Sequence, residues 1–189
     1  MIWILYIVGS LAALVVIMAI IGATLPREHV AARRAKLAKP ASDVWLALSD
    51  LDGQTSWRKG LRKVEHLDAR DGKPCFREIT AQGVITYVID EDRAPTSSAP
   101  GIRITRIADE RLPFGGRWIY ELASSDGTAP DSTLTITEDG FVKNPVFRFL
   151  SKTVFSQSAT LEHFLRNLGT HLGVEARPEP AEPSALARR

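Results

Sequence analysis

The first 24 residues, MIWILYIVGSLAALVVIMAIIGAT, constrain this chain most, because they are apolar and carry no charged side chain. As a helix rising about 1.5 Å per residue, this run spans about 30 Å or slightly more, enough to cross the hydrocarbon core of a membrane. A cleaved signal peptide normally has a basic start, a shorter apolar core and a small-residue cleavage site. No Lys or Arg precedes this run, so the sequence predicts a retained transmembrane anchor over residues 1–25.

Charge asymmetry around the anchor predicts its orientation. The basic residues that follow it most closely are Arg27, Arg33, Arg34 and Lys36. The positive-inside rule then places the C-terminal domain in the cytoplasm, as part of a single-pass membrane protein. The formal net charge is only +2, so an anionic lipid surface explains this cluster better than a nucleic-acid partner. Gly9 and Ala13 have the spacing of helix-dimer contacts, but the pattern is common by chance and the oligomeric state is left open.

Residues 29–173 have the patterning of one α+β domain. Alternation predicts a strand over residues 29–39, and two short helices follow within residues 41–60. Period-two segments separated by turn residues predict six antiparallel strands, over residues 61–68, 74–81, 84–91, 101–109, 115–123 and 132–139. Residues 144–173 predict one long amphipathic helix, and the Pro- and Glu-rich segment 174–189 predicts a disordered tail.

The middle of the chain resembles the START-like, helix-grip superfamily, known as SRPBCC, which includes the polyketide cyclase/dehydrase and lipid-transport group. The supporting segments are AKPASDVWLALSDLDGQTSWRKGLRKVEHL, LPFGGRWIYEL and TITEDGFVKNPVFRFLS. The resemblance covers roughly residues 29–172 and rests mainly on structural positions. It implies a curved antiparallel sheet of about seven strands wrapped around the long C-terminal helix, with a deep apolar cavity between them.

Alternation and helical spacing select the residues that would face such a cavity. The candidate ligand-binding residues are Trp118, Tyr120, Leu122, Ile136, Glu138, Phe147, Leu150, Val154 and Ser158. Each aromatic residue among them also has an ordinary interpretation as part of the core. Glu138 is the only candidate catalytic group: if buried it would need a partner, for which Arg33 and Arg106 are candidates, and its pKa would shift.

We expect no cofactor and no metal site. The four histidines, His29, His66, His163 and His171, lack metal-ligand spacing, and no phosphate-binding loop, dinucleotide-binding glycine motif or nucleophile elbow occurs. Three functions are therefore weighed. The first is a membrane-tethered domain that binds a hydrophobic small molecule or lipid. The second is a cyclase- or dehydratase-type enzyme acting on a polyketide-like substrate, and the third is a non-catalytic scaffold at the membrane. The sequence leaves open whether any reaction is catalysed.

Overall fold

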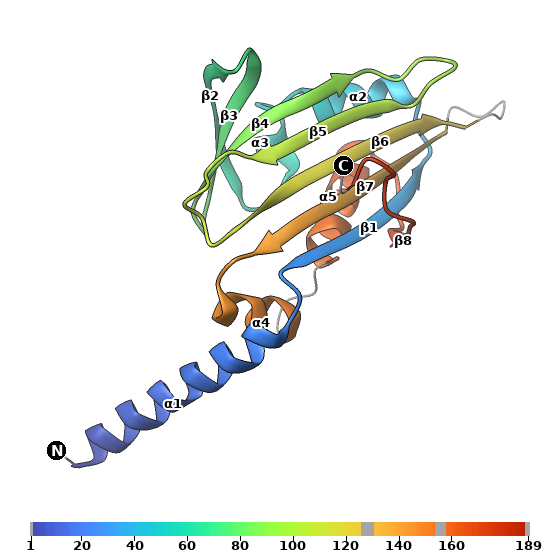
Figure 1. Cartoon of the computed structure of the whole chain (residues 1–189). Helices are drawn as coiled ribbons and strands as arrows, with labels where there is room; N and C mark the ends of the chain where they lie inside the picture. The colour runs from blue at the N-terminus through green and yellow to red at the C-terminus, as the bar shows by residue number, and fades with distance from the viewer. Residues whose placement is uncertain (1, 126–130, 154–157, 188–189) are drawn as a thin grey trace.

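The computed structural model describes residues 2–125, 131–153 and 158–187, and shows a helix projecting from a sheet-and-helix domain (Figure 1). The helices are α1 (Ile2–Thr24), α2 (Ala41–Ser49), α3 (Gln54–Trp57), α4 (Pro145–Thr153) and α5 (Ala159–His171). The strands are β1 (Glu28–Leu37), β2 (Leu61–Arg70), β3 (Lys73–Thr80), β4 (Val84–Arg93), β5 (Gly101–Ile107), β6 (Phe114–Ser124), β7 (Ser132–Val142) and β8 (Glu179–Pro180).

The sheet is antiparallel, with the strand order β2-β3-β4-β5-β6-β7-β1-β8. Alternation along β7 places Leu134 and Ile136 on the concave face, where both are fully buried, while Thr133 and Thr135 lie on the other face. Helix α5 packs against this face with a stripe of buried residues formed by Leu161, Leu165 and Leu168. The expected helix-grip fold is confirmed: a curved antiparallel sheet holds a C-terminal helix, with an apolar helix at the N-terminus.

The C-terminal helix differs from the single helix expected over residues 144–173. It is divided into α4 and α5, and residues 154–157, including the candidate Val154, lie outside the described residues. Helix α5 packs on the sheet, whereas α4 packs chiefly against α1, so Phe147 remains 52% exposed. Helical spacing alone does not reveal that two parts of one apolar stripe contact different partners.

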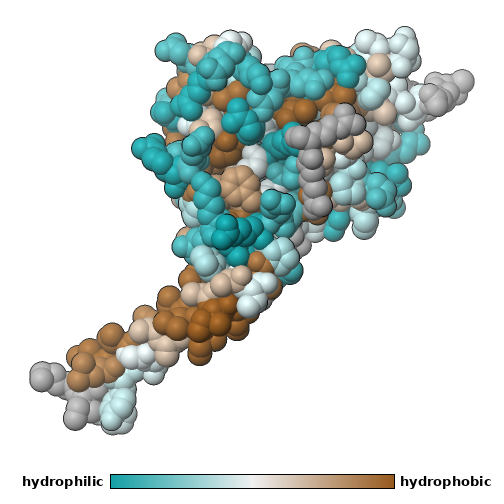
Figure 2. Space-filling model, in the orientation of Figure 1, coloured by the Kyte–Doolittle hydropathy of each residue, from teal (hydrophilic) through white to brown (hydrophobic). Residues whose placement is uncertain are grey.

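Helix α1 is long and apolar enough, by length and composition, to cross a membrane, and its apolar window is not buried against the domain. Figure 2 shows apolar side chains along this helix and a largely hydrophilic surface over the visible face of the domain. Only a few residues separate α1 from β1, which begins at Glu28. The domain is therefore joined closely to the end of α1.

Arg148 of α4 connects the end of α1 to the domain. Its side chain is buried, and Nη1 donates hydrogen bonds of 3.0 Å to the carbonyl oxygens of Gly22 and Leu25. Nε and Nη2 donate to the carbonyl oxygens of Val142 and Lys143, at 3.2 and 3.0 Å. A guanidinium at a helix C-terminus satisfies carbonyls that lack helical partners and interacts favourably with the helix dipole. One side chain thus fixes α1, α4 and the end of β7 together.

The tail also differs from the expected disorder. Val174 and Ala176 pack against the core beside Gly169 of α5, and Glu179–Pro180 pairs with β1 as strand β8. The Nε of Arg34 donates to Glu179 at 2.7 Å, and the Ser184 N–H donates to the Thr137 hydroxyl at 2.9 Å. Without the tail, β1 would be an edge strand with unpaired backbone groups, which is a hazard for association. Composition predicted disorder because the composition of a segment does not show that the edge of β1 is available for pairing.

Candidate functional site

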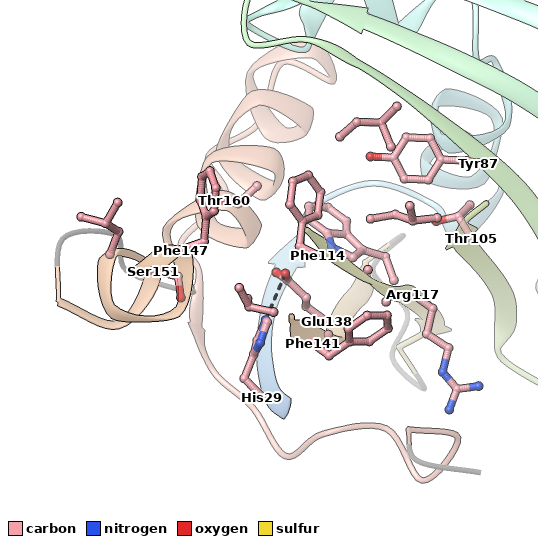
Figure 3. A pocket seen from close by; sticks show the side chains of 18 residues that line it. His29, Tyr87, Thr105, Phe114, Arg117, Glu138, Phe141, Phe147, Ser151 and Thr160 are labelled. Carbon is pink, nitrogen blue, oxygen red and sulfur yellow. Dashed lines mark hydrogen bonds and ion pairs between the residues drawn. The ribbon is translucent and has the colours of Figure 1, made fainter. Parts of the chain in front are cut away.

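A cavity of about 370 Å³ lies between the sheet, α4 and the start of α5 (Figure 3). Strands β4 to β7 contribute most of its wall, β1 contributes His29, and α4 contributes Phe147, Leu150 and Ser151. Its surface is predominantly apolar, with Phe114, Phe141, Trp118, Ile85, Ile107 and Val142 among the lining residues. We call this space the outer cavity, because it lies at the α4 end of the domain.

The outer cavity contains one ionisable pair, His29 and Glu138. Their Nε2 and Oε1 atoms are 3.4 Å apart, and their side chains are 17% and 24% exposed (Figure 3). Pairing of β1 with β7 brings His29 opposite Gly140, where a Cβ atom would lie 2.7 Å from the imidazole. Glycine at position 140 therefore leaves space for the ring beside Glu138. This half-buried pair can exchange a proton with a bound molecule.

The partners of Glu138 considered in the sequence analysis are both engaged elsewhere. Arg33 Nε donates to Glu162 of α5 at 3.0 Å, and Arg106 Nε donates to Asp90 of β4 at 2.9 Å. Alternation placed Glu138 on the concave face but did not reveal which residue of the neighbouring strand lies beside it. The β1–β7 register supplies His29 instead.

A second cavity, of about 210 Å³, adjoins the first and lies deeper under the sheet. The two share the lining residues Ile85, Tyr87, Thr105, Trp118 and Thr160. We call the second space the inner cavity. Polar and charged side chains occur in its wall, namely Gln54, Arg58, Glu78, Arg103 and the hydroxyl residues Tyr87 and Tyr120. The combined space is thus apolar near α4 and polar at its deep end.

An ion pair between Arg58 and Glu78 dominates the inner cavity. Both guanidinium Nη atoms contact the carboxylate, Nη2 with Oε2 at 3.0 Å, and the side chains are 22% and 8% exposed. Nη1 also donates to the Gln54 side-chain oxygen at 2.8 Å. Burial lowers the pKa of Arg58, but the nearby Glu78 carboxylate outweighs this and raises it overall. The pair is therefore charged and mutually neutralised.

Arg103 is also fully engaged, through contacts that join α2 to the sheet. Its Nε and Nη2 donate to Asp92 at 3.0 and 2.7 Å, and its Nη1 donates to the Leu48 carbonyl oxygen. The guanidinium carbon lies 5.5 Å from the centre of the Trp45 ring. Because both arginines already have carboxylate partners, the inner cavity has little unpaired positive charge for a strongly anionic ligand.

The tyrosine hydroxyls supply neutral hydrogen-bonding groups. Burial is the main cause that raises the pKa of both Tyr87 and Tyr120 far above the usual value of about 10. Tyr120 shares a hydrogen bond with Thr105, whereas no hydrogen bond to the Tyr87 hydroxyl occurs within the described part of the chain. Tyr87 is therefore available to donate to, or accept from, a polar group of a ligand.

These pKa shifts give a prediction for alkaline solutions. In the folded protein, Tyr87→Phe or Tyr120→Phe should leave the rise in phenolate absorbance between about pH 8 and about pH 11 unchanged. In urea, each variant should show about a third less of that rise than the unmodified protein, since the chain contains three tyrosines (Tyr 3). Because the folded pKa values are raised, their contribution to stability is complete below about pH 10 and is lost as pH rises further. Urea unfolding measured at about pH 8 and about pH 11 checks the loss of stability. A smaller absorbance rise in either folded variant than in the unmodified protein would contradict the raised pKa values.

The structure separates the candidate ligand-binding residues into three groups. Trp118 lines both cavities, Tyr120 lines the inner one, and Glu138, Phe147 and Leu150 line the outer one. Leu122 and Ile136 instead lie fully buried in the solid core, because the leucines of α5 fill the space beside them. Ser158, just before α5, is not part of the described wall of either cavity, and Val154 cannot be placed.

Sequence reasoning missed the ion pair of the inner cavity. Glu78 lies two residues after the buried Phe76 on β3, so a carboxylate occupies the inward phase of a strand. That position was a detectable signal for a buried charge that needs a partner. Arg58 follows the short helix α3 directly, and no periodicity indicated that it turns inward. In the described residues there is no group of three or more His, Cys, Asp or Glu suited to a metal ion.

No family model and no curated protein matches this chain. Solved structures do match it, and they show the fold. The Zhui aromatase/cyclase from Streptomyces sp. R1128 has a TM-score of 0.60 at 17% identity, covering 77% of this chain and 94% of that one. A START superfamily protein from Mycobacterium smegmatis gives 0.55 at 17%, covering 77% and 97%. Truncated norcoclaurine synthase from Thalictrum flavum gives 0.56 at 11%, covering 77% and 93%. The expected resemblance is confirmed at the level of fold.

Proposed function

We propose that this chain is a membrane-tethered binding protein whose helix-grip domain holds a hydrophobic small molecule or lipid. The observation that carries the proposal is the pair of adjoining cavities, apolar near α4 and polar at the deep end. An amphipathic molecule suits this distribution if its apolar body lies beside Phe114 and Phe141 and its polar group reaches Tyr87. A neutral hydroxyl or carbonyl group fits better than an anion, because Glu78 already neutralises Arg58.

The tether is supported by α1, whose length and composition suit a membrane span. Basic residues cluster after the span, so the positive-inside rule favours a cytoplasmic position for the domain. A ligand dissolved in the bilayer would then need to travel only a short distance to the cavity. Tethering a binding domain in this way raises the local concentration of a lipid ligand without requiring high affinity.

A second candidate function, a cyclase- or dehydratase-type enzyme, has one observation in its favour. Glu138 and His29 form an ionisable pair inside the outer cavity, where a proton could be removed from or returned to a bound substrate. The aromatase/cyclase and the synthase named above share this fold. Fold similarity alone does not transfer an activity, so binding remains the proposal.

Native mass spectrometry of the full-length chain in nanodiscs, after incubation with a membrane lipid extract, tests the proposal. Thr160 lies at the junction of the two cavities, so Thr160→Trp should reduce the bound ligand about tenfold by filling that space. Leu46→Trp is the matched control, since Leu46 is 71% exposed on α2 and should leave binding unchanged.

Absence of any bound molecule from the unmodified chain, or equal occupancy in the two tryptophan variants, would count against ligand binding in these cavities. The same spectra address the enzyme alternative. Loss of one water from the recovered molecule in the unmodified chain, but not in Glu138→Gln, would favour a dehydratase.

A further inference from the structure

Helix α4 is held at the point where α1 ends. Arg148 bonds the carbonyl oxygens of Gly22 and Leu25, and a Cβ atom at position 22 would lie 1.9 Å from the Pro145 oxygen. Figure 1 shows α4 between α1 and the sheet. At about 1.5 Å per residue, α1 fills the hydrocarbon thickness of a bilayer, so its last turn would lie at the membrane–water interface. Helix α4 would then lie at the same depth.

Exposed apolar side chains concentrate at this position. Outside α1, the large hydrophobic side chains that are exposed among the described residues are Leu46, Val84, Phe141 and Phe147. Two of these four, Phe141 at 37% and Phe147 at 52%, belong to the α4 side of the domain, beside the end of α1. Exposed aromatic residues are typical of proteins that insert into the interfacial region of a membrane.

Charged side chains on this side suit a phospholipid surface. Arg27, Lys143 and Lys152 are exposed around the end of α1 and α4, and Glu28 and Glu110 are exposed carboxylates nearby. Asp109 and Asp139 also lie there, but they form ion pairs with Arg111 and Arg117. Lys143 Nζ lies 5.7 Å from the centre of the Phe141 ring, so a cation and an exposed aromatic ring share one site. Outside the ion pairs, the three exposed cations outnumber the two exposed carboxylates, which favours anionic headgroups.

The exposed residues Phe141 and Phe147 also lie in the wall of the outer cavity. Phe141, Phe147, Leu150 and Ser151 line it, and Figure 3 places Phe147 and Ser151 on one side of the space and Phe141 on the other. We propose that α4 and Phe141 form a lip that lies in the bilayer interface, so that the outer cavity opens toward the lipid of the membrane to which the chain is tethered. This inference rests on the proposed tether. It adds which surface of the domain contacts the membrane and where a ligand enters the outer cavity.

Spin labels on the full-length chain, reconstituted in nanodiscs of phosphatidylcholine and phosphatidylglycerol, test the lip. Labels at Phe147→Cys, Leu46→Cys and Val15→Cys report the lip, an exposed control on α2 and the interior of α1. Cys75→Ala supplies a background without the native thiol, which is buried in any case. Collisions with oxygen, relative to a water-soluble nickel complex, should be severalfold more frequent at 147 than at 46.

The three labels distinguish failure of the lip from failure of the tether. A label at 147 that is as accessible to nickel as the one at 46, while the label at 15 is protected, would overturn the lip and leave the tether intact. A label at 15 that is accessible to nickel would overturn both. Protection at both 15 and 147, with access at 46, is the result expected.

Discussion

Replacing Arg148 by methionine should lower the free energy of unfolding by about 3 kcal/mol or more. The substitution keeps an apolar stem of similar length but removes the donors that now satisfy the carbonyl oxygens of Gly22, Leu25, Val142 and Lys143. These acceptors lie where α1, α4 and β7 meet, and Arg148 itself is only 5% exposed. Leaving buried acceptors without donors costs more than the net stabilisation from the bonds themselves.

Urea unfolding in detergent, followed by tryptophan fluorescence, measures this loss. Arg166→Met is the matched control, because Arg166 forms an exposed ion pair with Glu162 and should change stability by less than about 1 kcal/mol. Trypsin gives a local readout, since Arg27 lies just after α1 and should be cleaved faster when α4 no longer holds the junction. Equal stability of the two variants would show that water replaces the guanidinium at this junction.

The sequence predicted the strands well because each strand carries its own signal. Alternation in residues 132–139 and turn residues on both sides locate β7, whose inward residues Leu134 and Ile136 are indeed fully buried. The division of the terminal helix was not predictable in this way. Phe147 and Leu161 share helical spacing, yet one belongs to a helix packed on α1 and the other to a helix packed on the sheet.

The site was predictable only in part, because a cavity depends on what the neighbouring elements leave unfilled. Trp118 and Leu122 lie on the same face of β6, but Trp118 lines both cavities and Leu122 is fully enclosed by the core. Alternation gives the face and not the local depth of packing. The His29–Glu138 contact depends on the register between β1 and β7, which are far apart in sequence.

Replacing Arg58 by methionine should destabilise the protein by about 3–5 kcal/mol, because it leaves the Glu78 carboxylate without its cation. The Glu78 side chain is 8% exposed, so water cannot fully compensate for the lost partner. The substitution also removes the contact of the guanidinium with the Phe164 ring, 5.5 Å from its centre. Urea unfolding at neutral pH measures the loss, and Arg77→Met is the control, since Arg77 forms a longer, more exposed pair with Glu65.

The double variant Arg58→Met/Glu78→Leu separates the contribution of the pair to stability from its contribution to binding. Removing both charges should recover most of the stability lost in Arg58→Met, because no unpaired charge then remains in the inner cavity. If the proposed ligand directs a neutral polar group toward Tyr87, the double variant should still lose affinity for it, since the wall of the inner cavity has lost both charged partners of the ion pair. Recovered stability with unchanged binding in native mass spectrometry would assign the pair to folding alone. Stability that stays as low as in Arg58→Met would show that the two charges do more than neutralise each other, and that the bonds between Arg58 and Glu78 are needed to hold the end of α3 against β3.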